Sequence, residues 1–204
     1  MSHPATGAMM RAMVKVIDSF GSLLSRLAAA LALALALLVP AAGDDFTDRN
    51  ALDALFQALR QAPDPQTASA IDDKIWFYWI NPTDPVVAGR MNEVLTARRM
   101  GDAAEAIVLL DRLIADYPGY AEAWNQRATI YFEIGNFEAS IADCAKVLEL
   151  EPRHFGALSG RATMYLMLGQ RALALKDMVN AVAIHPFISG QQYFPELQRD
   201  MTRI

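Results

Sequence analysis

The side chains best able to do chemistry in this chain of 204 residues are its single cysteine, Cys144, and the histidines His154 and His185. A thiol attacks substrates only when a neighbouring group favours the thiolate, and no motif places a base near Cys144. Cys144 is therefore predicted to be an inert, buried residue. The two histidines lie at predicted helix-terminal turns, where we expect them to cap helices or face solvent near a negative dipole end.

Other reactive groups form no recognisable catalytic or metal-binding pattern. Acidic residues such as Glu133, Glu138 and Asp143 fall on helix faces that we expect to be solvated, and no pair for hydrolysis stands out. The spacing of histidines and carboxylates does not match a zinc site, and Met164 and Met167 lack a third soft ligand. Glycine-rich phosphate loops are absent. The sequence predicts no enzyme, no metal and no cofactor.

The elements that carry these residues repeat along the chain. Gly101, Gly135 and Gly169 are spaced by 34 residues, as are Pro118, Pro152 and Pro186. Small or modest apolar residues recur in the same register: Val94, Ala128 and Ala162; Ala106, Ser140 and Ala174; Leu113, Val147 and Ala181. A glycine turn in mid-unit and a proline after the second helix predict stacked helical hairpins, each buried against its neighbour.

This pattern resembles the tetratricopeptide repeat. The residues that carry the resemblance in the second and third copies are Trp124, Ala128, Tyr131, Gly135, Pro152, Ala162, Tyr165, Gly169 and Pro186. In the first copy Arg90 and Ala97 replace the expected Trp and Tyr, although Gly101 and Pro118 match. The resemblance implies an all-α, right-handed superhelical solenoid of about three and a half units plus a C-terminal capping helix. Its three repeats would span residues 87–120, 121–154 and 155–186.

The resemblance also implies a concave groove lined by the first helix of each pair. The expected groove residues are Asn92, Leu95, Arg98, Asn125, Thr129, Phe132, Ser159, Thr163 and Leu166. Their mixture of polar and apolar groups suits an extended peptide or a partner helix. A groove filled by the protein's own C-terminal helix is the alternative.

One specialised form of the family holds a C-terminal carboxylate with Lys, Asn and Arg in the groove. Asn125 is compatible with that clamp, but Leu95, Thr163 and Ser159 stand where other clamp residues are required. A carboxylate clamp is therefore not expected. Arg98 and Arg99 leave open a looser attraction to acidic peptides.

The N-terminal segment is predicted to direct export. Basic residues precede thirteen uncharged apolar residues, Leu27 to Val39, a run that is short for a spanning helix and suited to a signal peptide. We therefore interpret residues 1–43 as a signal peptide, with an uncleaved membrane anchor as the alternative. Removing this segment with its three basic residues and one acidic residue leaves 15 basic against 22 acidic residues, a net charge of −7. Such an acidic chain is a poor nucleic-acid ligand, and the periplasm is the expected compartment.

Residues 44–85 precede the repeats and read as a degenerate leading helical hairpin that closes the stack as an N-terminal cap. Its four consecutive aromatic residues, Trp76 to Trp79, offer an alternative role as a docking surface. Residues 187–204 are predicted to form the C-terminal capping helix, with Leu197 and Met201 on the third repeat. The predicted domains are therefore residues 1–43, 44–85, 86–186 and 187–204.

The sequence thus predicts an exported, non-enzymatic module that binds a peptide or helix of an envelope protein, as an assembly or scaffold factor. Two alternatives stay open. The aromatic leading hairpin could mediate self-association into a homo-oligomer, or the chain could be an enzyme subunit that uses Cys144 or the clustered acids.

Overall fold

The computed structural model describes residues 48–197. Residues 1–47 and 198–204, which include the predicted signal peptide and Met201, lie outside the described residues. Within this range the chain forms α-helices and one short 3-10 helix, with no strand. The predicted all-α fold is confirmed. No helix among the described residues combines the length and apolar character needed to cross a membrane.

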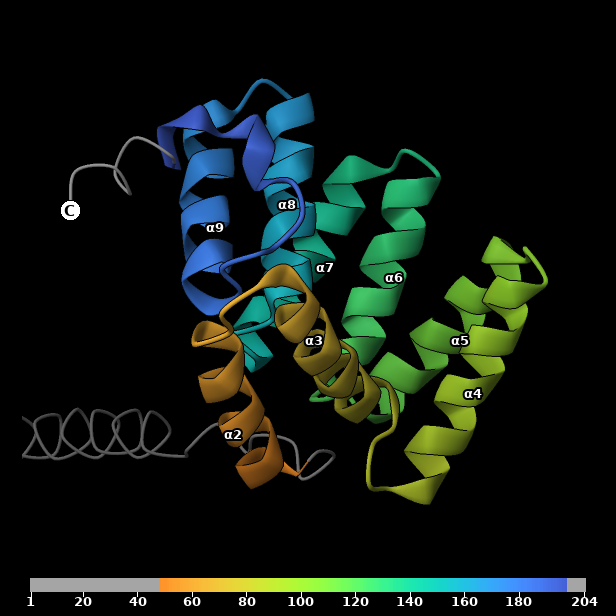
Figure 1. The fold of residues 1–204 in the computed structure, drawn as a ribbon. Helices are drawn as coiled ribbons and strands as arrows, with labels where there is room; N and C mark the ends of the chain where they lie inside the picture. The colour runs from red at the N-terminus through yellow and green to blue at the C-terminus, as the bar shows by residue number, and fades with distance from the viewer. Residues whose placement is uncertain (1–47, 198–204) are drawn as a thin grey trace, which may run out of the picture. The chain divides into compact units, whose positions relative to one another are not determined.

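The helices follow one another as antiparallel pairs joined by short turns (Figure 1). In chain order the pairs are α2 (Arg49–Arg60) with α3 (Pro65–Ile80), α4 (Pro85–Arg99) with α5 (Ala103–Asp116), α6 (Ala121–Glu133) with α7 (Phe137–Leu150), and α8 (Phe155–Met167) with α9 (Arg171–Ile184). The 3-10 helix η1 (Gln191–Tyr193) follows α9.

Side-chain caps begin most of these helices. Asp64 and Asp84 accept hydrogen bonds from the first backbone N–H groups of α3 and α4, and a proline follows each of them at the first helical position. Asp48, Asp102 and Asn136 cap α2, α5 and α7 in the same way. The caps satisfy N–H groups that have no partner within the helix, so the sequence sets where these helices begin.

The repeating glycines end the first helix of each repeat. Gly101, Gly135 and Gly169 have φ values of 77°, 80° and 72°, a left-handed conformation that other residues adopt at a cost. After Gly135, the N–H of Asn136 returns to the carbonyl of Tyr131 at 2.8 Å, which satisfies a carbonyl at the helix end. This explains the 34-residue glycine period.

Small residues let the two helices of each repeat approach closely. In the second repeat Ala128 faces Ser140, whose hydroxyl donates to the Ala128 carbonyl at 2.7 Å. In the third repeat Ala162 and Ala174 occupy the same positions and are fully buried. The packing therefore follows the register predicted from sequence.

A buried ion pair also recurs at the 34-residue spacing. Arg127 on α6 donates two hydrogen bonds to Asp143 on α7, each 2.8 Å long. Arg161 on α8 does the same to Asp177 on α9, at 2.6 and 2.9 Å. Asp143 was expected on a solvated face; instead it is buried because Arg127 supplies its partner.

The leading hairpin packs mainly on the last repeat. Its helices α2 and α3 share one buried cluster with α8, α9 and the segment after α9, and Ile80 at the end of α3 packs against the core of the first repeat. Figure 1 shows α2 and α3 beside α8 and α9, while α4 and α5 stand at the opposite edge. The cluster comprises Leu52, Phe56, Leu59, Ala68, Ile75, Trp79, Phe155, Leu158, Ala162, Ala174, Met178, Ala181, Ile188 and Phe194.

Aromatic side chains explain this placement. Trp79 is only 4% exposed and contacts both Phe56 and Phe155, with ring centroids 5.9 and 5.2 Å apart. Trp76 lies edge-on to Trp79 at 5.1 Å. Phe77, in contrast, is 62% exposed. Most of the aromatic residues predicted as a possible docking surface are therefore packed inside the fold.

The segment after α9 covers the third repeat with irregular structure. Ile188 and Phe194 are buried in the cluster shared with α2 and α3, and Leu197 packs against its edge. His185 ends α9, and its Nδ1 accepts the N–H of Phe187 at 3.3 Å. Residues 187–197 thus cover the last repeat through a turn, the 3-10 helix η1 and α-helical residues 195–197.

Candidate functional site

Four of the expected groove residues line one cleft between α6, α7 and α8. Asn125, Thr129 and Phe132 come from α6, and Thr163 comes from α8. The cleft has a volume of about 240 Å³. Its remaining walls are mostly small or apolar: Ala128, Ser140, Cys144, Gly156, Gly160 and Met164. We call this hollow the α6–α8 cleft.

The other expected residues of the third repeat lie beside the cleft. Ser159 is half-buried, and its hydroxyl donates to the Gly156 carbonyl at 3.2 Å. Leu166 packs against the hydrophobic cluster that α2 and α3 share with α8 and α9. Leu166 therefore stabilises the fold and does not line the cleft.

The expected residues of the first repeat do not join the cleft. Asn92 lines a separate, more open hollow of about 550 Å³ between α4 and α5. Leu95 packs in the core between the first repeat and α6. Arg98 reaches across to α6, where it pairs with Glu133 at 2.8 Å and donates to the side-chain oxygen of Gln126.

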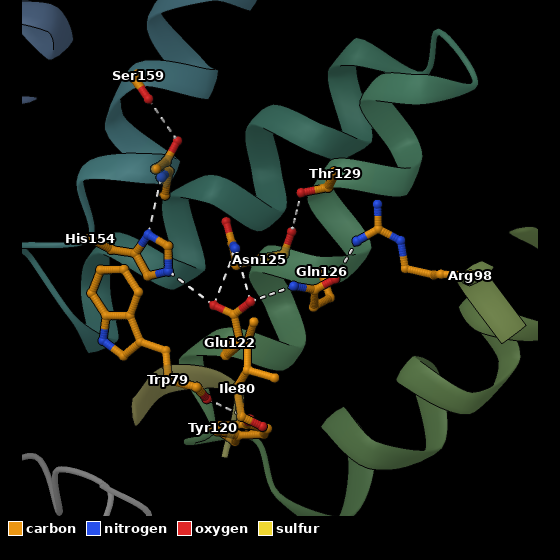
Figure 2. A network of polar contacts seen from close by, with 12 residues as sticks. Trp79, Ile80, Arg98, Tyr120, Glu122, Asn125, Gln126, Thr129, His154 and Ser159 are labelled. Atoms are coloured by element: carbon orange, nitrogen blue, oxygen red, sulfur yellow. Dashed lines mark hydrogen bonds and ion pairs between the residues drawn. The ribbon is translucent and has the colours of Figure 1, made fainter. Parts of the chain in front are cut away.

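A buried carboxylate, that of Glu122, lies next to the cleft at the start of α6. It is 1% exposed and accepts hydrogen bonds from the side-chain amides of Asn125, at 3.2 and 3.3 Å, and Gln126, at 2.5 Å. Figure 2 shows the network, which continues from Gln126 to Arg98. Burying a carboxylate is costly unless donors surround it, and here they come from neighbouring turns of one helix and from His154.

His154 joins the second and third repeats through both ring nitrogens. Nδ1 accepts the backbone N–H of Ala157 at 3.1 Å and so caps the N-terminus of α8. An accepting Nδ1 leaves the ring proton on Nε2, which lies 3.1 Å from the Glu122 carboxylate and donates to it. The expected capping role is therefore present, but the histidine is fully buried rather than solvent-facing.

Helix α3 contacts the network through Trp79 and Trp76. The Trp79 ring stacks on the His154 ring, with centroids 3.9 Å apart and planes 6° from parallel. The Tyr120 hydroxyl donates to the Trp79 carbonyl at 2.7 Å. Trp76 covers the first turn of α8, where a Cβ on Gly156 would lie 2.8 Å from the indole ring. Helix α3 therefore covers the start of α8 at this end of the site.

Cys144 forms part of the floor of the α6–α8 cleft. The side chain is buried, and desolvation raises the pKa of its thiol from an ordinary 9.0 to about 12. A thiol with so high a pKa carries almost no thiolate at neutral pH. This agrees with the predicted packing role.

The polar groups around the cleft are suited to binding. Among residues 48–197, no group of three or more His, Cys, Asp or Glu side chains is arranged to hold a metal ion. His154 is engaged at both nitrogens, and Glu122 is shielded from solvent. What the cleft offers a ligand is hydrogen bonding and apolar contact.

Sequence reasoning missed Glu122 and Gln126, and it missed the pairing of Arg127 with Asp143. The ion pairs carried a usable signal, because an Arg and an Asp sixteen residues apart occur twice in the repeat register. Glu122 and His154 carried none, since their 32-residue separation matches no motif and only the stacking of repeats brings them together.

Comparisons with known proteins agree with the repeat pattern. A family model described as tetratricopeptide repeat matches residues 121–154, and another with the same description matches residues 95–120. A TPR repeat-containing protein of Rhizobium etli is 38% identical over 138 residues, which cover 68% of this chain and 68% of that protein.

More distant similarities cover part of a longer protein or a smaller part of this chain. The PEX5-related protein of Homo sapiens is 27% identical over 71% of this chain, and the match spans 24% of that protein's length. A solved structure of the second TPR of Spaghetti (RPAP3), bound to an HSP90 peptide, has a TM-score of 0.47 and 22% identity. It covers 48% of this chain and 92% of that one.

Proposed function

The chain belongs to the tetratricopeptide repeat family, and we propose on this basis that it is a non-enzymatic binding protein that holds a segment of a partner in the α6–α8 cleft. Proteins built from these repeats are generally interaction modules. The observation that carries the proposal is the convergence of Asn125, Thr129, Phe132 and Thr163, from two successive repeats, on one hollow. The polar groups can pair with the hydrogen-bonding groups of a peptide, while the apolar walls bury its side chains.

The finer proposal concerns place and partner. The signal-like segment before residue 44 and the acidic remainder of the chain support export to the periplasm and a partner among envelope proteins, with a role in assembly. Mass spectrometry of the protein's N-terminus after cell fractionation tests export directly. A protein that starts near residue 44 in the periplasmic fraction supports the proposal, whereas an intact N-terminus in the cytoplasm contradicts it.

The two alternative functions find less support. Self-association through the leading hairpin needs a free aromatic surface, yet Trp79 is buried and Trp76 packs on α8. Catalysis by Cys144 needs a reactive thiolate, and burial raises the pKa of that thiol to about 12. The leading hairpin and Cys144 therefore do not favour self-association or catalysis as a second candidate function.

Photo-crosslinking in cells tests the binding function. Phe132 is the best position for a benzoylphenylalanine probe, because it is already aromatic, lines the cleft and is 37% exposed. The matched control is the same probe at Lys146, an exposed residue of α7 that is not part of the cleft. A defined partner captured from Phe132 and not from Lys146 supports the proposal. Equal capture at both positions, or none, argues against it.

A further inference from the structure

The hydroxyl groups of the α6–α8 cleft have all committed their protons to backbone carbonyls. Thr129 donates to the Asn125 carbonyl at 3.0 Å, and Thr163 donates to the Ser159 carbonyl at 2.9 Å. Ser140 donates to the Ala128 carbonyl at 2.7 Å. A carbonyl can only accept, so the proton in each bond must come from the hydroxyl. Ser140 is buried, but Thr129 and Thr163 are accessible, so each threonine hydroxyl offers a ligand its lone pairs.

The side-chain amide of Asn125 is also oriented so that it offers a ligand a hydrogen-bond acceptor. Its nitrogen faces the Glu122 carboxylate, because only the NH₂ end can donate to a carboxylate oxygen. Figure 2 shows the Asn125 oxygen directed away from Glu122. Hydrogen bonds in a chain polarise one another, so the buried carboxylate strengthens the Asn125 oxygen as an acceptor.

Basic residues are absent from the cleft lining. The nearest cation of the network, Arg98, is already engaged by Glu133 and Gln126. The other walls are apolar or small, including Ala128, Gly160 and Met164, and Phe132 stands exposed among the lining residues. The cleft thus has mostly apolar walls, and its threonine hydroxyls and the Asn125 oxygen are available to accept hydrogen bonds from a ligand.

From this polarity we infer that the α6–α8 cleft selects a lysine side chain of the partner protein. The inference rests on the proposed function and names the chemistry of the ligand. A lysine combines an apolar stem, which the small residues can cover, with an ammonium group that carries three donors and no acceptor. The aromatic face of Phe132 adds a favourable surface for a cation. A carboxylate brings only acceptors and would leave the cleft oxygens without partners.

The test uses four capped peptides of sequence Leu-Ala-Xaa-Ala-Leu, in which Xaa is lysine, Nε-acetyl-lysine, norleucine or glutamate. Binding to the full chain is followed by NMR of ¹³C-labelled methionine methyl groups. Met164 lines the cleft, and Met91, buried between α4 and α5, serves as the internal reference. We expect the lysine peptide to bind roughly tenfold more tightly than the norleucine peptide, as a charge-assisted hydrogen bond would give, and the glutamate peptide to bind most weakly.

Two threonine variants separate acceptor chemistry from shape. Thr163→Val keeps the shape of the side chain but removes the acceptor, so it should reduce the preference for lysine over norleucine at least threefold, within the range of one hydrogen bond. Thr96→Val is the matched control, because Thr96 makes the same bond to the Asn92 carbonyl but lies in the other hollow. It should leave the preference unchanged.

The outcomes distinguish the inference from the function on which it rests. Equal binding of the lysine and norleucine peptides, or tightest binding of the glutamate peptide, overturns the lysine inference while the cleft still binds peptides. A preference for acetyl-lysine over lysine overturns it too, since the charge would then be unfavourable. If no peptide moves Met164 and the crosslinker at Phe132 captures nothing, both the inference and the proposed function fail.

Discussion

The first and third repeats are built on one register but are buried very differently. The third repeat, α8–α9, is covered by α2 and α3 on one side and packs on α7 on the other. The first repeat, α4–α5, packs on α6 and is more open within residues 48–197, with Met100 80% exposed and an open hollow between its helices. Equivalent hairpins thus receive unequal support, and the repeat motif alone does not set their stability.

The ion pairs show the same difference. Arg161 and Asp177 form a largely buried pair in the third repeat, whereas Glu93 and Leu109 hold these positions in the first repeat. The first repeat instead has an exposed pair between Arg90 and Asp116. In a covered repeat a buried ion pair can hold two helices together, whereas an exposed ion pair contributes less to stability.

The largest expected effect comes from uncoupling the leading hairpin from the third repeat. Trp79→Ala removes the stack on His154 and the contacts with Phe56 and Phe155, so it should lower the free energy of unfolding by about 3–5 kcal/mol. Urea denaturation followed by circular dichroism measures this loss. The adjacent control Phe77→Ala removes an exposed ring and should change stability by less than about 0.5 kcal/mol. Equal losses would mean that the hairpin does not stabilise the third repeat.

The buried and exposed ion pairs give the next test. Asp177→Asn leaves Arg161 without its charged partner in a largely buried setting and should cost about 2–3 kcal/mol. Asp116→Asn breaks the exposed pair with Arg90 and should cost less than about 0.5 kcal/mol. The same denaturation measurement applies to both variants. A cost for Asp116→Asn that matched that of Asp177→Asn would remove the distinction between the two repeats.

Two glycines one turn apart on α8 sharpen the role of α3. Gly156→Ala would place its Cβ 2.8 Å from the Trp76 ring and should destabilise the protein by about 1–2 kcal/mol. Gly160→Ala meets no atom within 4 Å and should stabilise the helix by up to about 1 kcal/mol. Opposite signs in thermal or urea unfolding are expected. A stabilising Gly156→Ala would show that Trp76 does not press on this turn.

The smallest expected effect concerns Cys144, whose place in the first repeat is taken by Leu110. Burial raises the thiol pKa from 9.0 to about 12, so the unfolded chain loses the proton first as pH rises. The stability that the protonated thiol provides is complete below pH 9 and declines between the two pKa values. The wild type should lose about 1 kcal/mol more than Cys144→Ala between pH 9 and 10. Parallel pH profiles for the two proteins would contradict the raised pKa.

Much of the fold followed from local patterns in the sequence. The glycine turn at Gly135 and the close approach of Ala128 and Ser140 are set by neighbouring residues and by the period, and the sequence predicted both positions. The position of α2 and α3 did not follow, because Trp79 meets Phe155 across 76 residues without any periodic signal. The repeat register placed the hairpin next to the first repeat by analogy only.

The site shows the same division. The register brought Asn125, Thr129, Phe132 and Thr163 to one cleft without fixing what they bind. It assigned Asn92 to the same surface, yet Asn92 lines a different hollow. The direction of each hydrogen bond at the cleft depends on Glu122 and on backbone carbonyls of the assembled helices, which no linear motif encodes.

The contact between the leading hairpin and the last repeat bears on the order in which the chain can fold during synthesis. Helices α2 and α3 leave the ribosome first, but their aromatic residues pack on α8 and α9, which are made only after α4 to α7. Domains generally fold as units, and exposed apolar surface invites aggregation meanwhile. Trp79 and Phe56 therefore cannot reach their packing partner in the nascent chain until Phe155 has been translated. A chaperone that binds exposed apolar segments would consequently act on this protein early in its translation.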